Sequence, residues 1–429
     1  MVSTHNLVGP GGRLFAELRP SPDEVAFRVD NTSAAYYNSP YFTLHKNQVQ
    51  PVPKPRGNKM DLADVAGPDI ITGAQVAGKI TFHSVGDTGA AKVNRSQTAG
   101  TAIKQEATVA DTMAADVSSG AANAPAFFFH LGDVVYQFGE AQYYYDQFYE
   151  PYRAYDRPIF AIPGNHDGMV FGKTSATAQV PSLEAFLRNF CAAKAGPSPD
   201  SGGLVRSAMS QPGVYFTLDA PFVSIIGLYS NVLDGPGVIS SQGGHFTTVG
   251  DDQLTFLKSE LQRLAPDRKA GKRAIILAVH HPPLSADSKH SGSDGLSNDI
   301  DTACKAAGLW PDMVLSGHAH LYQRFTRRVG QQEIPYVVAG SGGFATTPPL
   351  QKLPHAPVTV GDHTLEIDPL IDFGYLTLTT DGHQLTVSFN SPATRGSKQL
   401  DTVTVDLQKG KLATKPRGAK AVGKAVGRK

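Results

Sequence analysis

The chain has 429 residues, of which 41% are hydrophobic and 18% are charged. This length is enough to bury one large core or two smaller ones without disulfide or metal staples. The 39 Lys and Arg residues nearly balance the 38 Asp and Glu residues, which argues against a globally basic, nucleic-acid-binding protein. Eight of the basic residues lie within 408–429, where no acidic residue occurs, so a mildly acidic body precedes a basic tail.

The two cysteines, Cys191 and Cys304, are too few for a disulfide framework and form no Cys-x-x-Cys pair. They could form one bridge or remain free thiols. No window approaches 18 uninterrupted apolar residues, so no transmembrane helix is expected. The first residues have neither the basic nor the apolar region of a secretory signal, which fits a cytoplasmic protein or an exported one whose signal is removed.

Residues 1–77 are rich in turn-forming Gly and Pro, with short strand-like runs such as 25–29, and predict an N-terminal extension or small β-rich module. From residue 79 onward, short apolar strands alternate with helical stretches. The expected strands are 80–85, 126–131, 158–162, 223–228, 274–279, 313–315 and 336–338. A helix is expected at 252–264, where Leu254, Leu257, Leu261 and Leu264 share one face. This alternation is typical of a layered α/β domain.

After residue 372 the pattern becomes strand–turn–strand. Residues 375–379 and 384–389 flank an Asp381-Gly382 turn and predict a hairpin, followed by a strand at 402–407. The Ala-, Gly- and Lys-rich end is expected to be disordered. The predicted divisions are an extension at 1–77, a catalytic domain at 78–408 and a basic tail at 409–429.

Five polar motifs each follow one of the apolar strands. They are Gly86-Asp87-Thr88-Gly89, Gly132-Asp133-Val134-Val135-Tyr136, Gly164-Asn165-His166-Asp167, His280-His281-Pro282-Pro283 and Gly317-His318-Ala319-His320. Ligands of open α/β sheets bind at the carboxyl ends of strands. The glycines fit tight strand-to-loop turns.

The residue types in these motifs indicate a metal site. Carboxylate, phenolate, amide and imidazole are hard or borderline ligands, and no thiolate is offered. The candidate donors are Asp87, Asp133, Tyr136, Asn165, His280, His318 and His320. These are too many for one tetrahedral zinc and suit two ions about 3.5–4 Å apart that share a bridging carboxylate. Any one motif alone could be an ordinary turn or polar loop, but five compatible motifs after five strands favour the metal site.

Together the motifs resemble the calcineurin-like metallophosphoesterases, and within them the purple acid phosphatases. All five superfamily motifs occur in order between Asp87 and His320. The subgroup resemblance depends on Gly89, where many superfamily members have a metal-binding His, on Tyr136, and on Tyr322 and Arg324 after the last motif. The resemblance covers roughly residues 78–395 and implies central β-sheets flanked by helices, preceded here by the β-rich N-terminal extension.

The resemblance also implies a cofactor of two metal ions. Asp87, Tyr136 and His320 would hold iron(III), whose phenolate ligand would colour the protein. Asn165, His280 and His318 would hold a divalent iron, zinc or manganese ion, with Asp133 as the bridge. His280 is preferred to His281 because the family's ligand lies two residues before a proline, here Pro282.

Three further histidines receive roles near the substrate. His166 matches a family histidine that contacts phosphate or assists the leaving group, and His290 falls near another substrate-facing histidine. A plain loop histidine is an equal alternative for His290. His281 could lie beside the metal ligands, contact the substrate or simply be exposed.

The expected function is acid phosphomonoesterase activity on a small phosphorylated substrate, with a metal-bound hydroxide as nucleophile. One alternative is a phosphodiesterase on the same fold, because substrate choice would lie in loops such as 168–182 and 235–249. Another is a non-catalytic binding protein that retains the fold, although no ligand is missing. Binding of nucleic acid or an anionic surface by the tail is a further hypothesis.

Overall fold

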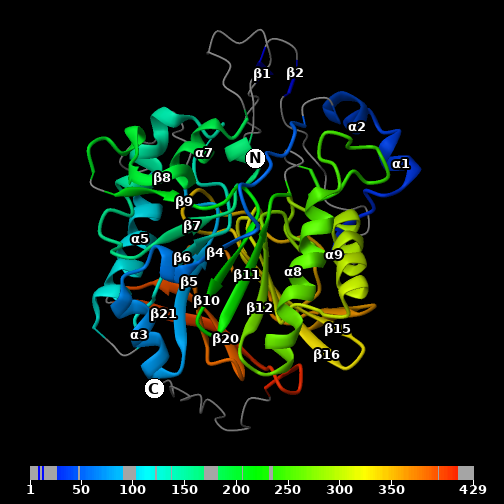
Figure 1. Ribbon diagram of the computed structural model, residues 1–429. Helices are drawn as coiled ribbons and strands as arrows, with labels where there is room; N and C mark the ends of the chain where they lie inside the picture. Colours follow the sequence, from blue (N-terminus) through cyan, green and yellow to red (C-terminus); the bar gives the residue numbers. More distant parts are fainter. Residues whose placement is uncertain are drawn as a thin grey trace, which may run out of the picture.

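A computed structural model describes residues 8–9, 12–13, 27–46, 49–89, 103–120, 123–136, 138–168, 182–204, 206–230, 235–394 and 396–413. In this part of the chain, two large mixed sheets form the centre of the molecule, and helices cover their outer faces (Figure 1). The layered α/β fold expected from the sequence is therefore confirmed.

The first sheet carries the three motifs that contain Asp87, Asp133 and Asn165. Its order, among described residues, is β22 (Lys411–Leu412), β21 (Ser397–Asp406), β20 (Gln384–Pro392), β19 (Tyr375–Thr380), β5 (Ile80–Val85), β6 (Phe128–His130) and β7 (Ile159–Ala161). β5, β6 and β7 are parallel, so their carboxyl ends share one edge. β19 and β20 form the expected hairpin, and β21 is longer than expected.

The second sheet carries the other two motifs. Its order within the described ranges is β17 (Val358–Val360), β18 (His363–Leu365), β15 (Tyr322–Val329), β16 (Gln332–Ala339), β14 (Met313–Ser316), β12 (Ala274–Val279), β11 (Val223–Leu228), β10 (Phe216–Ala220) and β4 (Lys59–Asp61). β11, β12, β14 and β16 are parallel, and antiparallel strands flank them.

The remaining strands form small sheets outside these two. The pairs are β1 (Val8–Gly9) with β2 (Gly12–Arg13), β3 (Arg28–Val29) with β13 (Gly292–Ser293), and β8 (Cys191–Pro197) with β9 (Ser207–Ser210).

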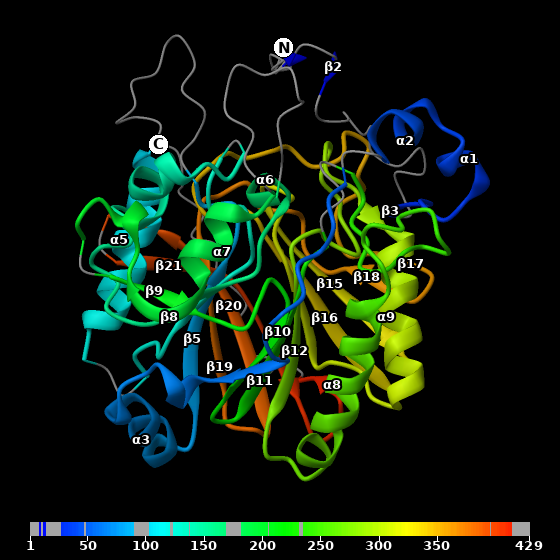
Figure 2. The same cartoon turned by 45° about the horizontal axis from the view of Figure 1, so that its top comes forward.

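The longer helices flank the two large sheets, whereas α1 (Ala34–Tyr37) and α2 (Pro40–His45) stand apart from them, as Figure 2 shows. The described helices are α1 (Ala34–Tyr37), α2 (Pro40–His45), α3 (Pro68–Ala77), α5 (Lys104–Ser118), α6 (Asn165–Gly168), α7 (Glu184–Phe190), α8 (Asp252–Lys269) and α9 (Asp294–Ala307). α8 begins where the leucine pattern predicts but continues past Pro266. None of the described helices is long and apolar enough to cross a membrane.

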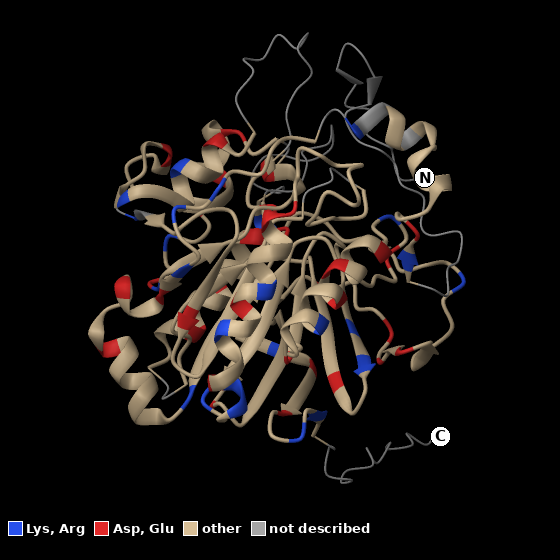
Figure 3. Cartoon of the chain, turned by 45° about the vertical axis from the view of Figure 1, so that its right-hand side comes forward, with Lys and Arg blue, Asp and Glu red and all other residues tan. Residues whose placement is uncertain are grey.

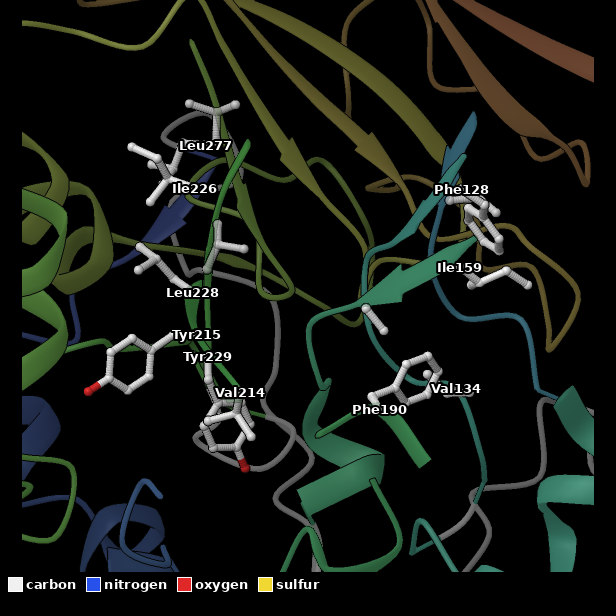
Figure 4. Close-up of a cluster of buried hydrophobic side chains, with 14 of the residues drawn as sticks. Phe128, Val134, Ile159, Phe190, Val214, Tyr215, Ile226, Leu228, Tyr229 and Leu277 are labelled. Carbon is white, nitrogen blue, oxygen red and sulfur yellow. The ribbon is translucent and has the colours of Figure 1, made fainter. Parts of the chain in front are cut away.

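The core has two parts because successive strand residues face opposite sides of each sheet. Phe127 and Phe129 belong to the cluster between the sheets, whereas Phe128 belongs to the cluster between sheets and helices. Figure 4 shows part of the latter, including Phe128, Ile159 and Leu277. Burying each large apolar side chain contributes about 1.5–3 kcal/mol. Central strands such as β11 and β12 are buried on both faces, which explains their nearly continuous hydrophobic runs.

Within the described part of residues 27–77, two strands pair with later parts of the chain. β4 extends the second sheet beside β10, and β3 pairs with β13 next to the loop that carries His290. Ser33 and Ser39 cap α1 and α2 through hydrogen bonds to backbone N–H groups. The domain boundary at residue 77 stays a prediction.

Two further expectations from composition can be compared with the structure. Cys191 and Cys304 are both buried free thiols, so they do not form the disulfide bridge that was the other alternative. Acidic and basic residues are interspersed along the described ribbon, in keeping with the near balance of charge (Figure 3). Residues 414–429, most of the basic tail, lie outside the described residues.

Candidate metal centre

The five motif-bearing turns meet where the carboxyl edges of the two sheets come together. Within the first sheet, the Asp87 N–H donates to the Gly132 carbonyl at 2.9 Å, which joins the turns after β5 and β6. His280 Nδ1 lies 2.8 Å from the Leu131 carbonyl and so crosses from the second sheet to the first. The structure thus brings all five predicted motifs into one site.

Three of the predicted donors form a first group around Asp87. Its Oδ1 accepts a hydrogen bond from the Tyr136 hydroxyl at 3.1 Å and lies 3.4 Å from His320 Nε2. All three side chains are buried. These are the residues for which the resemblance implies iron(III).

Three others form a second group around Asn165. Its Oδ1 lies 3.0 Å from both His280 Nε2 and His318 Nδ1. These three side chains are also buried. The grouping matches the set expected to hold the divalent ion.

Asp133 lies between the two groups. Its Oδ2 accepts a hydrogen bond from the Tyr136 hydroxyl at 3.0 Å and is 3.4 Å from His280 Nε2. A single carboxylate oxygen therefore reaches one member of each group, which is the arrangement that a bridging ligand requires.

The donor spacing fits bound metal ions. Tetrahedral or octahedral ions with ligands at about 2.0–2.1 Å place neighbouring donor atoms roughly 2.8–3.4 Å apart. The contacts within and between the two groups span 3.0 to 3.4 Å. Donor atoms of Asp133, His280 and His318 all lie within 4.8 Å of one another. The residues present therefore fit a metal centre.

The electrostatics of the two central histidines fit as well. Burial would lower the pKa of His280, but the facing Asp133 and Asp87 carboxylates outweigh it and raise that pKa to about 9. In contrast, burial and the neighbouring His281, His290, His280 and His320 rings hold the pKa of His318 well below its usual range. The carboxylates thus favour positive charge beside His280, while neutral His318 keeps a lone pair available for coordination.

Several of these donors have a strained backbone conformation. Asp87, Asp133 and His318 have φ values of 57°, 56° and 66°, in the left-handed region that side-chain-bearing residues seldom adopt. Such conformations collect at functional sites, where surrounding structure maintains them. Of the glycines that precede these three ligands, only Gly132 also has a positive φ, 96°.

Gly164 is required for close approach rather than for its φ value. A Cβ at Gly164 would lie 2.1 Å from Asp133 Oδ1 and 2.4 Å from the Asp133 nitrogen. The turns after β6 and β7 are therefore in direct backbone contact. Asp167 joins the same turns by accepting the N–H groups of Gly164 at 2.9 Å and Val134 at 3.1 Å.

The other predicted histidines also lie at this site. The His166 N–H donates to Asp133 Oδ1 at 2.8 Å, and its ring centroid is 4.3 Å from that of Tyr136. The His290 ring lies 4.6 Å from His318 and 4.9 Å from His320. His166 and His290 are partly exposed, whereas the seven predicted ligands are buried.

His281 is buried, with 1% of its surface exposed, so it is not the exposed residue that one sequence-based alternative allowed. Its Nδ1 lies 3.1 Å from the Ser230 hydroxyl, and its ring packs 4.2 Å from His318. Contact between His281 and substrate stays a prediction.

Several supporting residues were not recognised from the sequence. Phe344 stacks on Tyr136 with ring centroids 3.6 Å apart and lies edge-on to His320 at 5.3 Å. It follows a Gly340-Ser341-Gly342-Gly343 run after β16, a signal that could have marked a loop in tight contact with the site. Asp167 belongs to one of the five motifs, but the sequence alone assigns it no role.

The Tyr322 and Arg324 extension of the last motif has a structural explanation. The Tyr322 hydroxyl and Arg324 Nε both donate to Asp401 Oδ2, at 2.8 and 2.6 Å. These bonds join β15 of the second sheet to β21 of the first. They hold the sheets together rather than supplying donors to the metal centre.

Two facing sheets with a buried set of oxygen and nitrogen donors at their shared edge define a metal-dependent hydrolase of mixed α/β fold. The family model of the calcineurin-like phosphoesterases matches residues 82–322, and the chain belongs to this family. Members of the family typically use two metal ions.

A solved structure shows the same fold at low sequence identity. A purple acid phosphatase from yellow lupin (Lupinus luteus) seeds is similar over 76% of this chain, with a TM-score of 0.51 and 16% identity. The chain spans about half of that protein, 54% of its length. A dimetal phosphatase from Danio rerio gives a TM-score of 0.44 and 12% identity over 76% of this chain and 99% of its own. None of the curated proteins compared with the chain matches its sequence.

Proposed function

We propose that the protein is an acid phosphomonoesterase that uses an iron(III) ion and a divalent iron, zinc or manganese ion. Asp87, Tyr136 and His320 would hold the iron(III), Asn165, His280 and His318 the divalent ion, and Asp133 would bridge them. The observation that carries this proposal is the position of the Tyr136 hydroxyl, 3.1 Å from Asp87 and 3.0 Å from Asp133. A phenol between two carboxylates supplies the hard donor that iron(III) favours.

When bound, the metal pair would lower the pKa of water and neutralise charge on the phosphate. The chain's own residues would bind and orient the ester. His166 and His290 are the predicted site residues that are partly exposed, so both can reach a substrate. His290 Nδ1 lies 3.4 Å from Asp287 Oδ1, and this contact holds the imidazole beside the His318 and His320 rings. His290 is thereby suited to donate a proton to the leaving alkoxide.

The buried histidine His281 would orient the metal ligand beside it. Its ring packs against His318 and is itself held by Ser230. Partners of this kind fix the orientation of ligating imidazoles. Contact with substrate would then fall to His166 and His290.

A pH–rate profile with matched aryl phosphate monoester and diester substrates tests the proposal, on protein purified without chelator. We expect faster monoester hydrolysis with an optimum below pH 7. Elemental analysis should find iron, and the visible spectrum should contain a phenolate-to-iron band. Diester preference near neutral pH would contradict the monoesterase proposal and favour the alternative phosphodiesterase. Bound metal without turnover of either substrate would favour a non-catalytic role.

A further inference from the structure

A buried polar cluster lies directly behind the metal centre. It contains Thr88, next to Asp87 after β5, Glu106 from α5 and His130 at the end of β6. All three are completely buried. None of the three can reach a substrate, and none belongs to the predicted ligand set. Any effect that they have on the metal centre must therefore pass through the residues beside them.

The direction of the hydrogen bonds in this cluster follows from one backbone group. The Gly132 N–H, which can only donate, points to His130 Nδ1 at 3.1 Å. Nδ1 is therefore an acceptor, and the ring proton is on Nε2. Nε2 lies 2.8 Å from Thr88 Oγ1, so His130 donates to the Thr88 hydroxyl. The Thr88 hydroxyl proton must then point to another acceptor.

Glu106 offers that acceptor. Neither of its carboxyl oxygens has a hydrogen-bond partner of good geometry among the described residues. Glu106 and Thr88 lie side by side at Gly343, where an added Cβ would be 2.6 Å from both Glu106 Cβ and the Thr88 carbonyl oxygen. Burial raises the pKa of Glu106 well above its usual range, and an interaction with the Thr88 hydroxyl works against this rise. The other inward residues of α5 include Val109, Met113 and Val117, which are apolar. A carboxyl at such a position costs free energy, which is consistent with a specific role.

We propose that Glu106, Thr88 and His130 form a hydrogen-bonded clamp that sets the distance between the Asp87 and Asp133 turns. The Thr88–His130 bond connects the residue after Asp87 to the strand end that precedes Asp133. The Gly132 bond then orients the turn that carries Asp133, the proposed bridge. Asp87 and Asp133, one in each turn, both have positive φ. These three are positioning residues, and the clamp rests on the proposed function because the turns carry the proposed ligands.

The first test is the tautomer of His130, which needs no metal. In full-length protein with ¹⁵N-labelled histidine, the His130 signals should be those of a neutral ring protonated at Nε2. Loss of these signals in a His130→Gln variant assigns them. A ring protonated at Nδ1 would overturn the clamp, because it could not accept the Gly132 N–H.

The second test measures release of the bound metal ions from purified protein to EDTA, followed by elemental analysis. Outer partners of metal ligands typically change affinity by about 10- to 100-fold. Thr88→Val should release metal at least tenfold faster than wild type, while Thr88→Ser, which keeps the hydroxyl, should retain it. Thr217→Val is the matched control, since Thr217 is buried in β10 with no hydroxyl partner among the described residues. Release from Thr88→Val at the wild-type rate would overturn the proposal.

Variants of Glu106 separate positioning from ordinary structural support. Glu106→Met removes a buried carboxyl of similar size, so it should leave the melting temperature unchanged or raise it, yet accelerate metal release. Lower thermal stability with wild-type release would overturn the role of Glu106. Tyr152, whose hydroxyl is buried near Glu106 and Thr88, is the competing acceptor. Tyr152→Phe should behave as wild type, and faster release from it would overturn the choice of Glu106.

Failure of the proposed function can be distinguished from failure of the clamp. Wild-type protein that holds no metal and takes up no added Mn²⁺ would contradict the proposed metal centre. The His130 tautomer would still decide whether the clamp exists. Metal-loaded wild type with an unaffected Thr88→Val variant would contradict the clamp alone.

Discussion

Residue exposure separates two kinds of side chain within the centre. The seven proposed ligands are buried, whereas His166 and His290 keep part of their surface accessible. A ligand gains from exclusion of water because its electrostatic interactions strengthen in a low dielectric. A residue that contacts substrate must remain within reach. We therefore expect substitutions of the ligands to change metal binding, and substitutions of the proposed catalytic residues to change turnover.

Removal of the Tyr136 hydroxyl should affect the metal centre directly. Tyr136→Phe takes away the donor atom that contacts both Asp87 and Asp133, so we expect loss of the visible absorption band and a lower iron content. Absorption spectroscopy and elemental analysis measure both effects. Tyr144→Phe is the control, because Tyr144 is equally buried but its hydroxyl has no partner among the described residues. A coloured Tyr136→Phe protein would contradict Tyr136 as the iron ligand.

Substitution of His290 should separate chemistry from metal binding. Loss of a proton donor typically lowers the rate by about 10²–10⁴-fold. We expect His290→Gln to reduce kcat for an aryl phosphate by about 10²-fold, with metal content unchanged. Steady-state kinetics and elemental analysis check this, with exposed His355→Gln as the control. Wild-type kcat in His290→Gln would show that the histidine is a plain loop residue.

At the scale of elements, the site depends on how closely the turn between β7 and α6 approaches the turn after β6. Gly164→Ala would place a methyl group against the Asp133 carboxylate and backbone. One turn must then move, so we expect loss of bound metal and of turnover. Elemental analysis and kinetics measure the effect.

Gly73→Ala is the matched control for Gly164→Ala. Gly73 lies inside α3, and nothing lies within 4 Å of a Cβ added there. Alanine should stabilise that helix by about 0.5–1 kcal/mol, because glycine loses more backbone entropy on folding. Urea unfolding measures whether Gly73→Ala raises the free energy of unfolding. Full metal content in Gly164→Ala would contradict the contact between the two turns.

At the scale of the whole molecule, the two sheets are joined by a polar link as well as by their apolar core. Burial would raise the pKa of Asp401, but hydrogen bonds from Arg324 outweigh it and hold the pKa below its usual range. A hydrogen bond to a charged group contributes about 1.5–3 kcal/mol. We therefore expect Asp401→Asn to lower the free energy of unfolding by about 2 kcal/mol at pH 7.

The pH dependence of this loss follows from linkage. An aspartate whose pKa is lower in the folded state stabilises the fold fully above its unfolded pKa of about 3.9, and this contribution disappears as pH falls through the folded value. The difference between wild type and Asp401→Asn should therefore shrink below about pH 4. Urea unfolding at several pH values measures it, with Asp111→Asn, at an exposed aspartate of α5, as a control that changes little. A constant difference across this range would contradict the charged link.

Much of this molecule could be predicted from local sequence patterns. The bounds of β5, β11 and β12 agree with the apolar runs that predict them, because each strand is buried on both faces. The motifs that follow the strands also identify the candidate ligands, since a turn after a parallel strand lies at the carboxyl edge of its sheet. A run of apolar residues and the turn that ends it are local properties, so a sequence can determine them.

The tertiary structure decided which of these residues meet. The His318 N–H donates to Asp87 Oδ2 at 2.7 Å although the two residues are 231 positions apart. The division of the donors around Asp133, the link from Arg324 to Asp401 and the position of Glu106 behind Thr88 likewise depend on how two sheets and a helix pack. Residue spacing along a chain determines contacts only within an element or turn. Contacts between distant segments are determined by topology and by close packing of the core.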